Sequence, residues 1–470
     1  MATATLTAPA PPESPLAQLQ RLCDPGSFRA LRSGVSSTRL GERAAPGDGV
    51  VCGAGEVGGR PVFCYAQDPA FLGGSLGEVH ADTIVRLMRM AGDAGAPIVG
   101  FVRSGGARLQ EGHSALAGYG RIFRASVELS RRVPQISILD GVSAGGGAYS
   151  PALTDFVVMT EAARMFLTGP QVVREALGEE IDMEALGGPR LHARNGVCQL
   201  VAADAEAAIE QARRLLGLLP APIGSAPPTL SPLAPGGADA GAEVPADPRK
   251  VYDVRAVAAA LVDAGSLLEL SPRWAPNMVT AFARIDGKPV GIVANQPRAI
   301  GGVIDAPAAE KAALFVASCD RFRLPLVVLV DTPGFMPGRR QEELGVIRHG
   351  ASLLHAFAAA TVPKLTVVLR KAFGGAAITM NSKDLGADLV FSWPRAQIGI
   401  MAARQAVGIV HRRALAAADG PSLENLADAY AGEHLTATAA AASGFVDEVI
   451  EPEQTRDRLA WSLRSLRDGF

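Results

Sequence analysis

The sequence lacks several features that mark common classes of protein. Its five cysteines are scattered over 470 residues and form no CxxC pair, which argues against a zinc site and fits a reducing compartment. No run of 18 apolar residues is free of a charge or a helix breaker, so no membrane-spanning helix is expected. The formal net charge of -2 leaves no basic surface for nucleic acid. We therefore expect no metal, no membrane and no nucleic-acid partner.

The first 15 residues, MATATLTAPAPPESP, have neither a basic start nor a continuous apolar core. This pattern predicts a disordered leader rather than a signal peptide. Together with the scattered cysteines, it predicts a cytoplasmic protein.

The chain contains an internal repeat. GRPVFCYAQDP at 59–69 returns as GKPVGIVANQP at 287–297, with five identities that are each 228 positions apart. After one inserted residue, four later positions recur 229 residues on: Gly105, Pro134, Gly145 and Gly146 become Gly334, Pro363, Gly374 and Gly375. Between the copies, 219–248 is rich in Pro, Gly, Ala and Ser, as linkers are. The repeat predicts an N-terminal domain at 1–218, a linker at 219–248 and a C-terminal domain at 249–470.

Each predicted domain alternates strand-like and helix-like periods after an opening hairpin signal, GG at 58–59 and DG at 286–287. The first copy reads as helix 78–93, strand 97–103, helix 114–131, strand 135–140 and short strands at 156–160 and 165–169. The second reads as helix 306–322, strand 326–332, helix 342–360, strand 365–370 and short strands at 389–393 and 397–401. This alternation predicts an α/β fold of mostly parallel sheets with helices outside.

Two familiar motifs occur in contexts that weaken them. Gly53, Gly55 and Gly58 match GxGxxG, but a second strand-like run follows where a dinucleotide site needs a helix, so a plain hairpin is favoured. GVSAG at 141–145 matches the nucleophile elbow around Ser143. The repeat has Ala372 at the corresponding position, and no Asp and His pair completes a triad downstream. A small residue in a tight turn is favoured there over a serine hydrolase.

Paired glycine loops occur at four equivalent places. RSGGAR and SAGGGA follow two strands of the first domain, and DTPGF and FGGAA follow the same strands of the second. Glycine lets a strand turn sharply and leaves its N–H open to a ligand. Two such loops in one domain can direct two N–H groups at one oxygen, which is an oxyanion hole. Glycines in a single loop can serve a tight turn alone, but four loops in register favour two holes that stabilise two enolate-like anions.

The longest motifs resemble the β subunit, or carboxyltransferase component, of biotin-dependent acyl-CoA carboxylases such as propionyl-CoA carboxylase. They include SGGARLQEG, AGGGAYSPALTDFVVM, DTPGFMPGRRQEELGVIRHGASLL and RKAFGGAAITMNSKDLGADLVFSWP, and the resemblance runs from about 20 to 465. It implies two tandem crotonase-like (ββα-spiral) domains. It also implies that carboxybiotin releases carbon dioxide to give a biotin enolate, whose ring nitrogen takes the α-proton of the acyl-CoA. No side-chain base is required for that chemistry.

The resemblance also implies roles for particular residues. Gly145 and Gly146 would hold the thioester enolate oxygen, and Gly375 and Ala376 would hold the biotin ureido oxygen. The remaining implied residues are Gly106, Ala107, Ala144 and Ile378 on the acyl-CoA side and Gly334, Phe335 and Gly374 on the biotin side. Ile378 and Arg103 stand where many members of this family have Asp, so the usual acetyl or propionyl preference is not assumed.

No AMKM-like biotinyl-lysine motif and no ATP-binding module is found in the sequence. We therefore expect biotin to arrive on a biotin carboxylase/biotin carboxyl carrier subunit. The family implies a homo-hexamer built as a trimer of dimers, with each active site between the N-terminal domain of one subunit and the C-terminal domain of another. Two alternatives stay open, which are a biotin-dependent acyl-CoA decarboxylase component and a non-catalytic scaffold paralogue.

Overall fold

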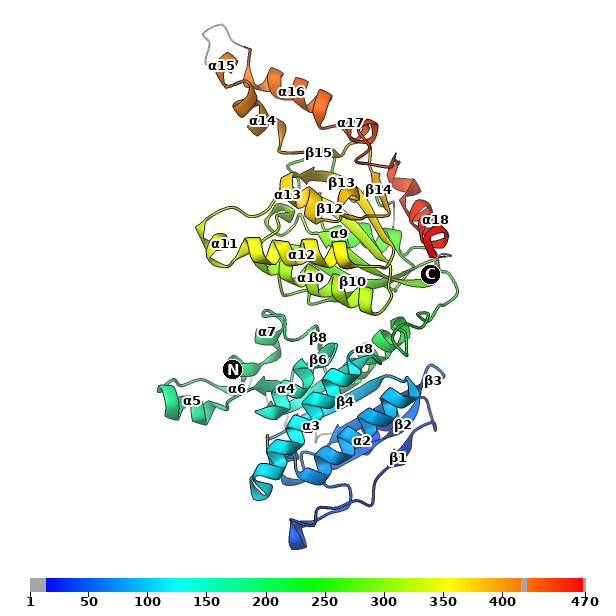
Figure 1. Ribbon diagram of the computed structural model, residues 1–470, viewed down its shortest axis with the longest axis vertical. Helices are drawn as coiled ribbons and strands as arrows, with labels where there is room; N and C mark the ends of the chain where they lie inside the picture. Colours follow the sequence, from blue (N-terminus) through cyan, green and yellow to red (C-terminus); the bar gives the residue numbers. More distant parts are fainter. Residues whose placement is uncertain (1–13, 238, 416–420, 468–470) are drawn as a thin grey trace, which may run out of the picture. The chain divides into compact units, whose positions relative to one another are not determined.

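The computed structural model describes residues 14–237, 239–415 and 421–467, and its contacts divide the chain into two compact units (Figure 1). The first unit runs to His192 and includes Val197–Gly217 and Ala221–Ile223. The second comprises Ala193–Gly196, Leu218–Pro220 and the chain from Gly224 onward. The predicted leader lies almost wholly outside the described residues. No described helix is long and apolar enough to cross a membrane.

The first unit is built on one eight-stranded sheet of order β1-β2-β3-β4-β5-β6-β8, with β7 paired to β5. Strands β1 to β3 are antiparallel, and all later pairs are parallel. The bounds are β1 Arg29–Leu31, β2 Val50–Val57, β3 Arg60–Gln67, β4 Ile98–Ser104, β5 Gln135–Ala144, β6 Phe156–Thr160, β7 Arg164–Phe166 and β8 Leu200–Ala202. The carboxyl ends of β4 and β5 therefore lie side by side, where the SGGAR and SAGGGA loops begin.

Two long helices cover one face of this sheet. Helices α2 (Glu78–Ala94) and α3 (His113–Leu129) pack side by side (Figure 1) and share a core with β2, β3 and β4. The other helices are α1 Pro15–Leu22, α4 Gly146–Ala152, α5 Pro170–Leu177, α6 Met183–Gly187, α7 Pro189–His192 and α8 Ala205–Leu218. The pattern that predicted helices at 78–93 and 114–131 is confirmed to within a few residues at each end.

The second unit repeats the sheet with the same connections, in the order β16-β14-β13-β12-β11-β10-β9 with β15 paired to β13. Its strands are β9 Leu268–Leu270, β10 Met278–Ile285, β11 Lys288–Asn295, β12 Leu326–Thr332, β13 Lys364–Phe373, β14 Leu389–Ser392, β15 Gln397–Gly399 and β16 Glu448–Val449. Part of the predicted linker packs on this unit, since Pro235 forms a β-bridge with Asp263 and Ala240 is buried in its core.

Helices cover both faces of the second sheet. Helix α10 (Ala306–Arg321) packs against α12 (Val346–Ala359), and α9 (Val254–Leu261) and α18 (Thr455–Arg467) contribute to the core that contains β10 to β13. The single helix expected at 342–360 is wrong at its start, because Gly345 adopts a left-handed conformation with φ of 74° and separates α11 (Arg339–Glu343) from α12.

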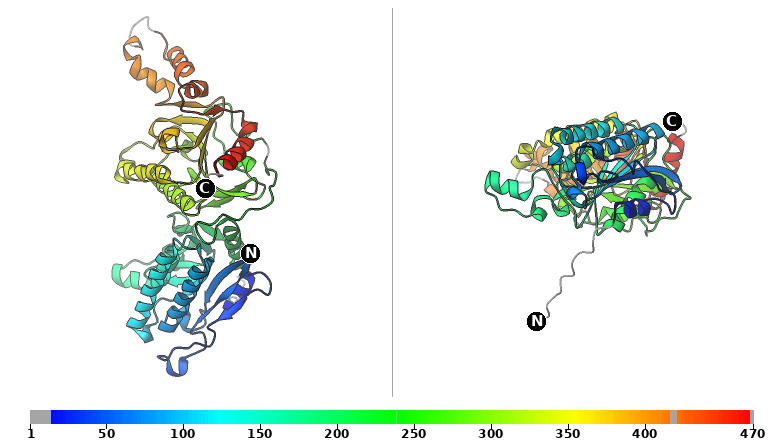
Figure 2. Two further views of the ribbon diagram at one scale, coloured as in Figure 1. Left: turned by 45° about the vertical axis from the view of Figure 1, so that its right-hand side comes forward. Right: turned by 90° about the horizontal axis from the view of Figure 1, so that it is seen from below.

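A helical segment not anticipated from the sequence projects from the second unit (Figure 2). It comprises α14 Ala403–Val410, α15 Arg412–Leu415 and α16 Leu423–His434, and α17 Ala437–Ala442 follows it. Helix α13 (Gly374–Thr379) lies nearer the sheet, directly after β13.

Both hairpins form as expected. Gly58 and Gly59 join β2 to β3, and Asp286 and Gly287 join β10 to β11, with positive φ at all four residues as a two-residue type I′ turn requires. The GxGxxG match lies largely within β2 of the first hairpin and opens no helix. It is therefore part of a hairpin in this structure.

Candidate functional site

The SGGAR loop of the first unit leaves β4 and pairs briefly with the chain before α2. Leu76 and Ala107 form a parallel bridge, in which the Leu76 N–H donates to the Gly106 carbonyl at 2.9 Å and the Arg108 N–H donates to the Leu76 carbonyl at 3.0 Å. The Gly106 N–H donates to Ser104 Oγ at 3.2 Å, and Gly106 has a φ of 103° that favours glycine. These bonds fix the loop while the Ala107 N–H faces away from Leu76, because alternate amides of a strand point to opposite sides.

The second loop of this unit turns from β5 into α4. Gly145 makes the turn with a φ of 58°, and its N–H donates to the Phe166 carbonyl of β7 at 3.1 Å. The amide of Gly145 is therefore engaged within the sheet. The first N–H groups of α4, starting with that of Gly146, have no acceptor within the helix. For the acyl-CoA side, we expect Gly146 and Ala107, rather than Gly145, to supply the oxyanion donors.

The position of Gly146 is also fixed by packing. A Cβ atom added to Gly146 would lie 2.7 Å from the ring of Tyr119 on α3, closer than a side chain tolerates. The Tyr119 hydroxyl is hydrogen-bonded to Ser104 Oγ at 3.0 Å, and burial raises the pKa of Tyr119 to about 12. Glycine is therefore required at 146 for a steric reason as well as for access to its amide.

The second unit reproduces the first loop bond by bond. Ile304 bridges Phe335, the Ile304 N–H donates to the Gly334 carbonyl at 3.1 Å and the Met336 N–H donates to the Ile304 carbonyl at 2.8 Å. The Gly334 N–H donates to Thr332 Oγ1 at 3.3 Å. Each residue lies 228 positions after its counterpart in the SGGAR loop. The sequence repeat is therefore a repeat of loop geometry.

The second loop of this unit, FGGAA, is likewise equivalent to SAGGGA. Gly374 has a φ of 60°, close to the 58° of Gly145, and opens α13. No atom outside its chain neighbours lies within 4 Å of a Cβ added to Gly375. The next residue, Ala376, is fully buried, whereas Ile378 is exposed on α13. The space around the Gly375 amide is thus open.

A cavity of about 490 Å³ joins the two loops of the second unit. It brings together four residues assigned to the biotin side from the sequence, which are Gly334, Phe335, Gly374 and Gly375. Its other walls come from Pro333, Lys371, Phe373, Gln397, Ile400, Met401, Ala402 and Gln405. Neither Ala376 nor Ile378 lines it. The cavity combines aromatic surface with open backbone amides, which suits a flat, mainly apolar ring system with one carbonyl oxygen.

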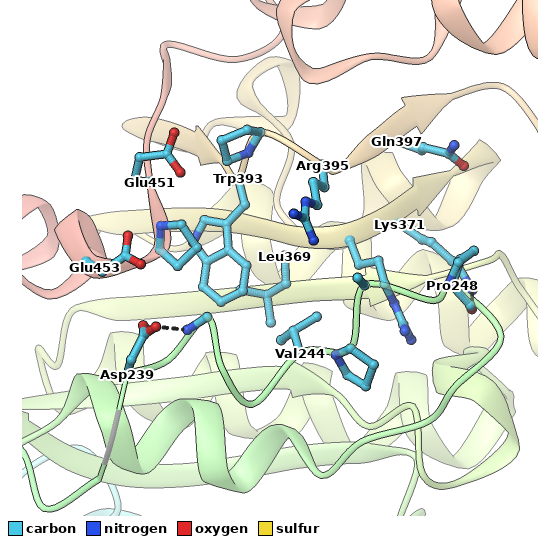
Figure 3. Close-up of a pocket in the computed structure, with 16 residues that line it drawn as sticks. Asp239, Val244, Pro248, Leu369, Lys371, Trp393, Arg395, Gln397, Glu451 and Glu453 are labelled. Atoms are coloured by element: carbon cyan, nitrogen blue, oxygen red, sulfur yellow. Dashed lines mark hydrogen bonds between the residues drawn. The ribbon is translucent and has the colours of Figure 1, made fainter.

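Lys371 and Gln397 also line a second cavity of about 400 Å³ in the same unit (Figure 3). Trp393, Leu369 and the chain around Val244 enclose it, and the Lys371 ammonium donates to the Pro248 carbonyl at 2.7 Å. Burial, and then the nearby Arg370 charge, lower the pKa of Lys371. Sequence reasoning did not single out Lys371, although it begins the KAFGGA motif itself.

Ser143, the serine of GVSAG, is fully buried and donates its hydroxyl to the Gly147 carbonyl at 2.8 Å. A nucleophile needs an exposed oxygen and a neighbouring base, and this hydroxyl is neither exposed nor placed as a nucleophile. We predict that Ser143→Ala keeps near-normal carboxyl transfer and loses about 1 kcal/mol of stability, the typical value of one hydrogen bond. Transfer rates and labelling by a fluorophosphonate check this. Covalent labelling of Ser143 with loss of activity would contradict it.

In the part of the chain that the structure describes, no group of three or more His, Cys, Asp or Glu side chains is arranged to hold a metal ion. The groups available at the glycine loops are backbone amides, aromatic rings and one lysine. This set can stabilise a developing oxyanion and can bind an apolar ring.

Comparison with known proteins places the chain in a well-defined group. The family model described as Carboxyl transferase domain matches residues 14–469. The methylmalonyl-CoA carboxyltransferase 12S subunit of Propionibacterium freudenreichii subsp. shermanii is 45% identical over 458 residues, which cover 95% of this chain and 87% of the relative. The methylmalonyl-CoA decarboxylase subunit alpha of Propionigenium modestum is 43% identical over 463 residues, covering 96% and 89%.

A solved structure is similar over nearly the whole chain. The transcarboxylase 12S crystal structure, described as a hexamer assembly with methylmalonyl-coenzyme A and methylmalonic acid bound, matches with a TM-score of 0.93 and 44% sequence identity. The match covers 97% of this chain and 89% of that chain. The similarity thus extends across both units and includes all four glycine loops.

Proposed function

Because the chain belongs to the carboxyl transferase domain family, we propose that it moves a carboxyl group from carboxybiotin to the α-carbon of a short acyl-CoA. The observation that carries this proposal is the repeated loop geometry, in which Ala107 and Gly146 of the first unit match Phe335 and Gly375 of the second. Two equivalent pairs of amides suit a reaction with two carbonyl oxygens that both gain negative charge.

We assign the acyl-CoA side to the N-terminal domain at 1–218 and the biotin side to the C-terminal domain at 249–470, joined through 219–248. Carboxybiotin supplies the carboxyl group, and its ring nitrogen accepts the α-proton once that group has left. Phe335 and Gly375, with Ala376 beside them, hold the ureido oxygen. Ala107 and Gly146 hold the thioester oxygen as the enolate forms, and the enolate carbon then attacks carbon dioxide.

The biotin assignment is supported by the cavity of the second unit. The rings of Phe335 and Phe373 offer apolar surface, and Gly375 offers an amide with open space in front of it. A bicyclic ring with a single polar carbonyl fits this combination better than a charged ligand does.

The proposed partners follow from this chemistry. Biotin is carried and carboxylated by a biotin carboxylase/biotin carboxyl carrier subunit, and the chain assembles as a homo-hexamer, a trimer of dimers. The two proposed holes then belong to different subunits and meet when the face-to-face contact repeats. We infer a cytoplasmic location, in keeping with five buried cysteines that are all free thiols.

The experiment that tests the function supplies a biotinylated carrier, its carboxylase, ATP, labelled bicarbonate and an acyl-CoA. Acyl-CoA-dependent incorporation of label that requires this chain is the expected result. A second candidate is decarboxylation of a carboxylated acyl-CoA, favoured by the 43% identity to a methylmalonyl-CoA decarboxylase subunit alpha. Transfer of label from methylmalonyl-CoA to the carrier, without incorporation from bicarbonate, would favour that candidate. Activity in neither direction would favour a scaffold.

We predict a broad acyl preference set in part by Ile378, an exposed apolar residue on α13. A buried methylene gains about 0.8 kcal/mol, so butyryl-CoA is accepted as well as propionyl- and acetyl-CoA. One methylene discriminates only about 10- to 200-fold, so the enzyme is tolerant. The check compares kcat/KM on the three substrates before and after Ile378→Asp. An unchanged ranking would remove Ile378 from the acyl pocket.

A further inference from the structure

A buried ion pair lies at the base of the glycine loops in the first unit. The Arg103 guanidinium on β4 binds both carboxylate oxygens of Asp140 on β5 through its Nε and Nη2 atoms. The two side chains are only 5% and 4% exposed. Arg103 immediately precedes SGGAR, and Asp140 immediately precedes GVSAGGGA. The pair therefore joins the two strands just before both loops leave the sheet.

The second unit has an ion pair at the same place with the charges exchanged. Asp331 on β12 accepts a hydrogen bond from Arg370 Nε on β13 at 3.0 Å, and the side chains are 1% and 9% exposed. Asp331 lies 228 positions after Arg103, so an acid replaces a base at the same point of the repeat. Its partner is one position further along the strand than Asp140, which corresponds to Leu369. The pairing across the strands recurs, and its polarity does not.

The surroundings of the two pairs correspond as well. The Arg103 N–H donates to Gln67 Oε1 at 3.1 Å, and the Asp331 N–H donates to Asn295 Oδ1 at 3.2 Å, from equivalent positions of β3 and β11. Each aspartate also accepts a bond from near the first helix of its unit, Asp140 from Gln18 Nε2 at 2.5 Å and Asp331 from the Tyr252 hydroxyl at 2.9 Å. Both ion pairs are thus held by a third group.

The strand pairing is irregular at both pairs. The β4–β5 register shifts between Val102 and Ser104, and the β12–β13 register shifts between Val330 and Thr332. Such a bulge removes regular ladder bonds and bends the strand. At these points, the ion pair supplies the connection between neighbouring strands that the ladder lacks.

We propose that the Arg103–Asp140 and Arg370–Asp331 pairs are positioning elements that set the separation of the two glycine loops in each unit. The attraction across the strands is what matters, and the sign of the charge on either strand does not. The pairs act through the loops and touch no substrate. The catalytic part of this inference rests on the proposed function, because the paired amides must meet one oxygen and a misplacement of about 1 Å can cost on the order of a hundredfold in rate.

Three variants of the first unit test the proposal in the full chain. Arg103→Met leaves Asp140 without its cation, and we expect kcat to fall on the order of ten- to a hundredfold with little change in KM. Arg103→Asp with Asp140→Arg reverses the pair and regains on the order of tenfold over the single variant. Arg103→Met with Asp140→Leu replaces the pair by apolar side chains, and we expect it to fold but to keep the low kcat. The matched control, Arg124→Met with Glu128→Leu, removes an exposed pair on α3 and leaves kcat unchanged.

Hydrogen exchange of the peptides that cover 104–112 and 143–150 gives a readout independent of the reaction. Faster exchange there in the single and apolar variants, and recovery in the reversed variant, supports the proposal. An apolar variant with normal kcat and exchange would overturn it, and so would a folded reversed variant as impaired as Arg103→Met. If the wild-type chain transfers no carboxyl group, the proposed function fails while the exchange result still decides the role of the pair.

Should the double variants not fold, Tyr252→Phe probes the other unit by removing a single hydrogen bond to Asp331. Faster exchange of the peptide that covers 332–338, without a change in exchange elsewhere, is then expected. Unchanged exchange in that peptide would contradict a positioning role.

Discussion

Gly375→Val is expected to abolish carboxyl transfer while the protein remains folded. A valine side chain at this position enters open space, since nothing lies within 4 Å of an added Cβ, and the backbone there is not left-handed. The same side chain stands in front of the amide that we assign to the ureido oxygen. Loss of one oxyanion donor costs on the order of a hundredfold to a thousandfold in kcat. Transfer rates, together with thermal unfolding, provide the measurement.

Gly432→Val is the matched control, because Gly432 is also a helical glycine of the second unit with nothing within 4 Å of an added Cβ. It should retain activity. Gly146→Val tests the other hole less cleanly, because the new side chain would press on Tyr119 at 2.7 Å and disturb packing as well as the amide. Normal transfer by a folded Gly375→Val variant would show that the biotin-side hole is wrongly placed.

Arg108→Met is expected to destabilise the first unit by about 3–5 kcal/mol, the usual cost of leaving a buried charge unpaired. The Arg108 side chain is fully buried, with Nη1 at 2.7 Å from Asp48 Oδ1 and 2.8 Å from Glu111 Oε1. Its Nη2 donates to the Ser75 carbonyl at 3.0 Å. Methionine fills much of the volume but leaves two carboxylates without their cation. Denaturant unfolding followed by probes in the first unit measures the loss.

Arg124→Met is the control, since it removes an exposed i,i+4 pair with Glu128 on α3. Such pairs contribute about 0.3–0.5 kcal/mol. The repeat offers a natural parallel, because the position 228 residues after Arg108 is Met336. The second loop geometry is therefore compatible with methionine where no buried acids surround it. A loss for Arg108→Met no larger than that of the control would mean that Asp48 and Glu111 are satisfied without the guanidinium.

The sequence by itself determined the repeat, the two hairpins, the strand order and the places of the glycine loops. These features depend on residues that are near one another along the chain. A two-residue turn needs positive φ, as at Gly58 and Gly59, and an apolar run followed by glycine ends a strand, as before Gly145. The grouping of Gly334, Phe335, Gly374 and Gly375 around one cavity followed from loops on adjacent parallel strands, because the carboxyl ends of such strands lie together.

Only the tertiary structure decided how individual groups are used. The Gly145 amide could be assigned to a substrate until the pairing of β5 with β7 placed the Phe166 carbonyl 3.1 Å from it. Arg103 looked like a departure from its family until β4 and β5 brought Asp140 beside it. Neither partner is signalled by local pattern, because each comes from another strand and the pairing depends on register and burial. The same limit applies to α14, α15 and α16, whose helices pack mainly on one another.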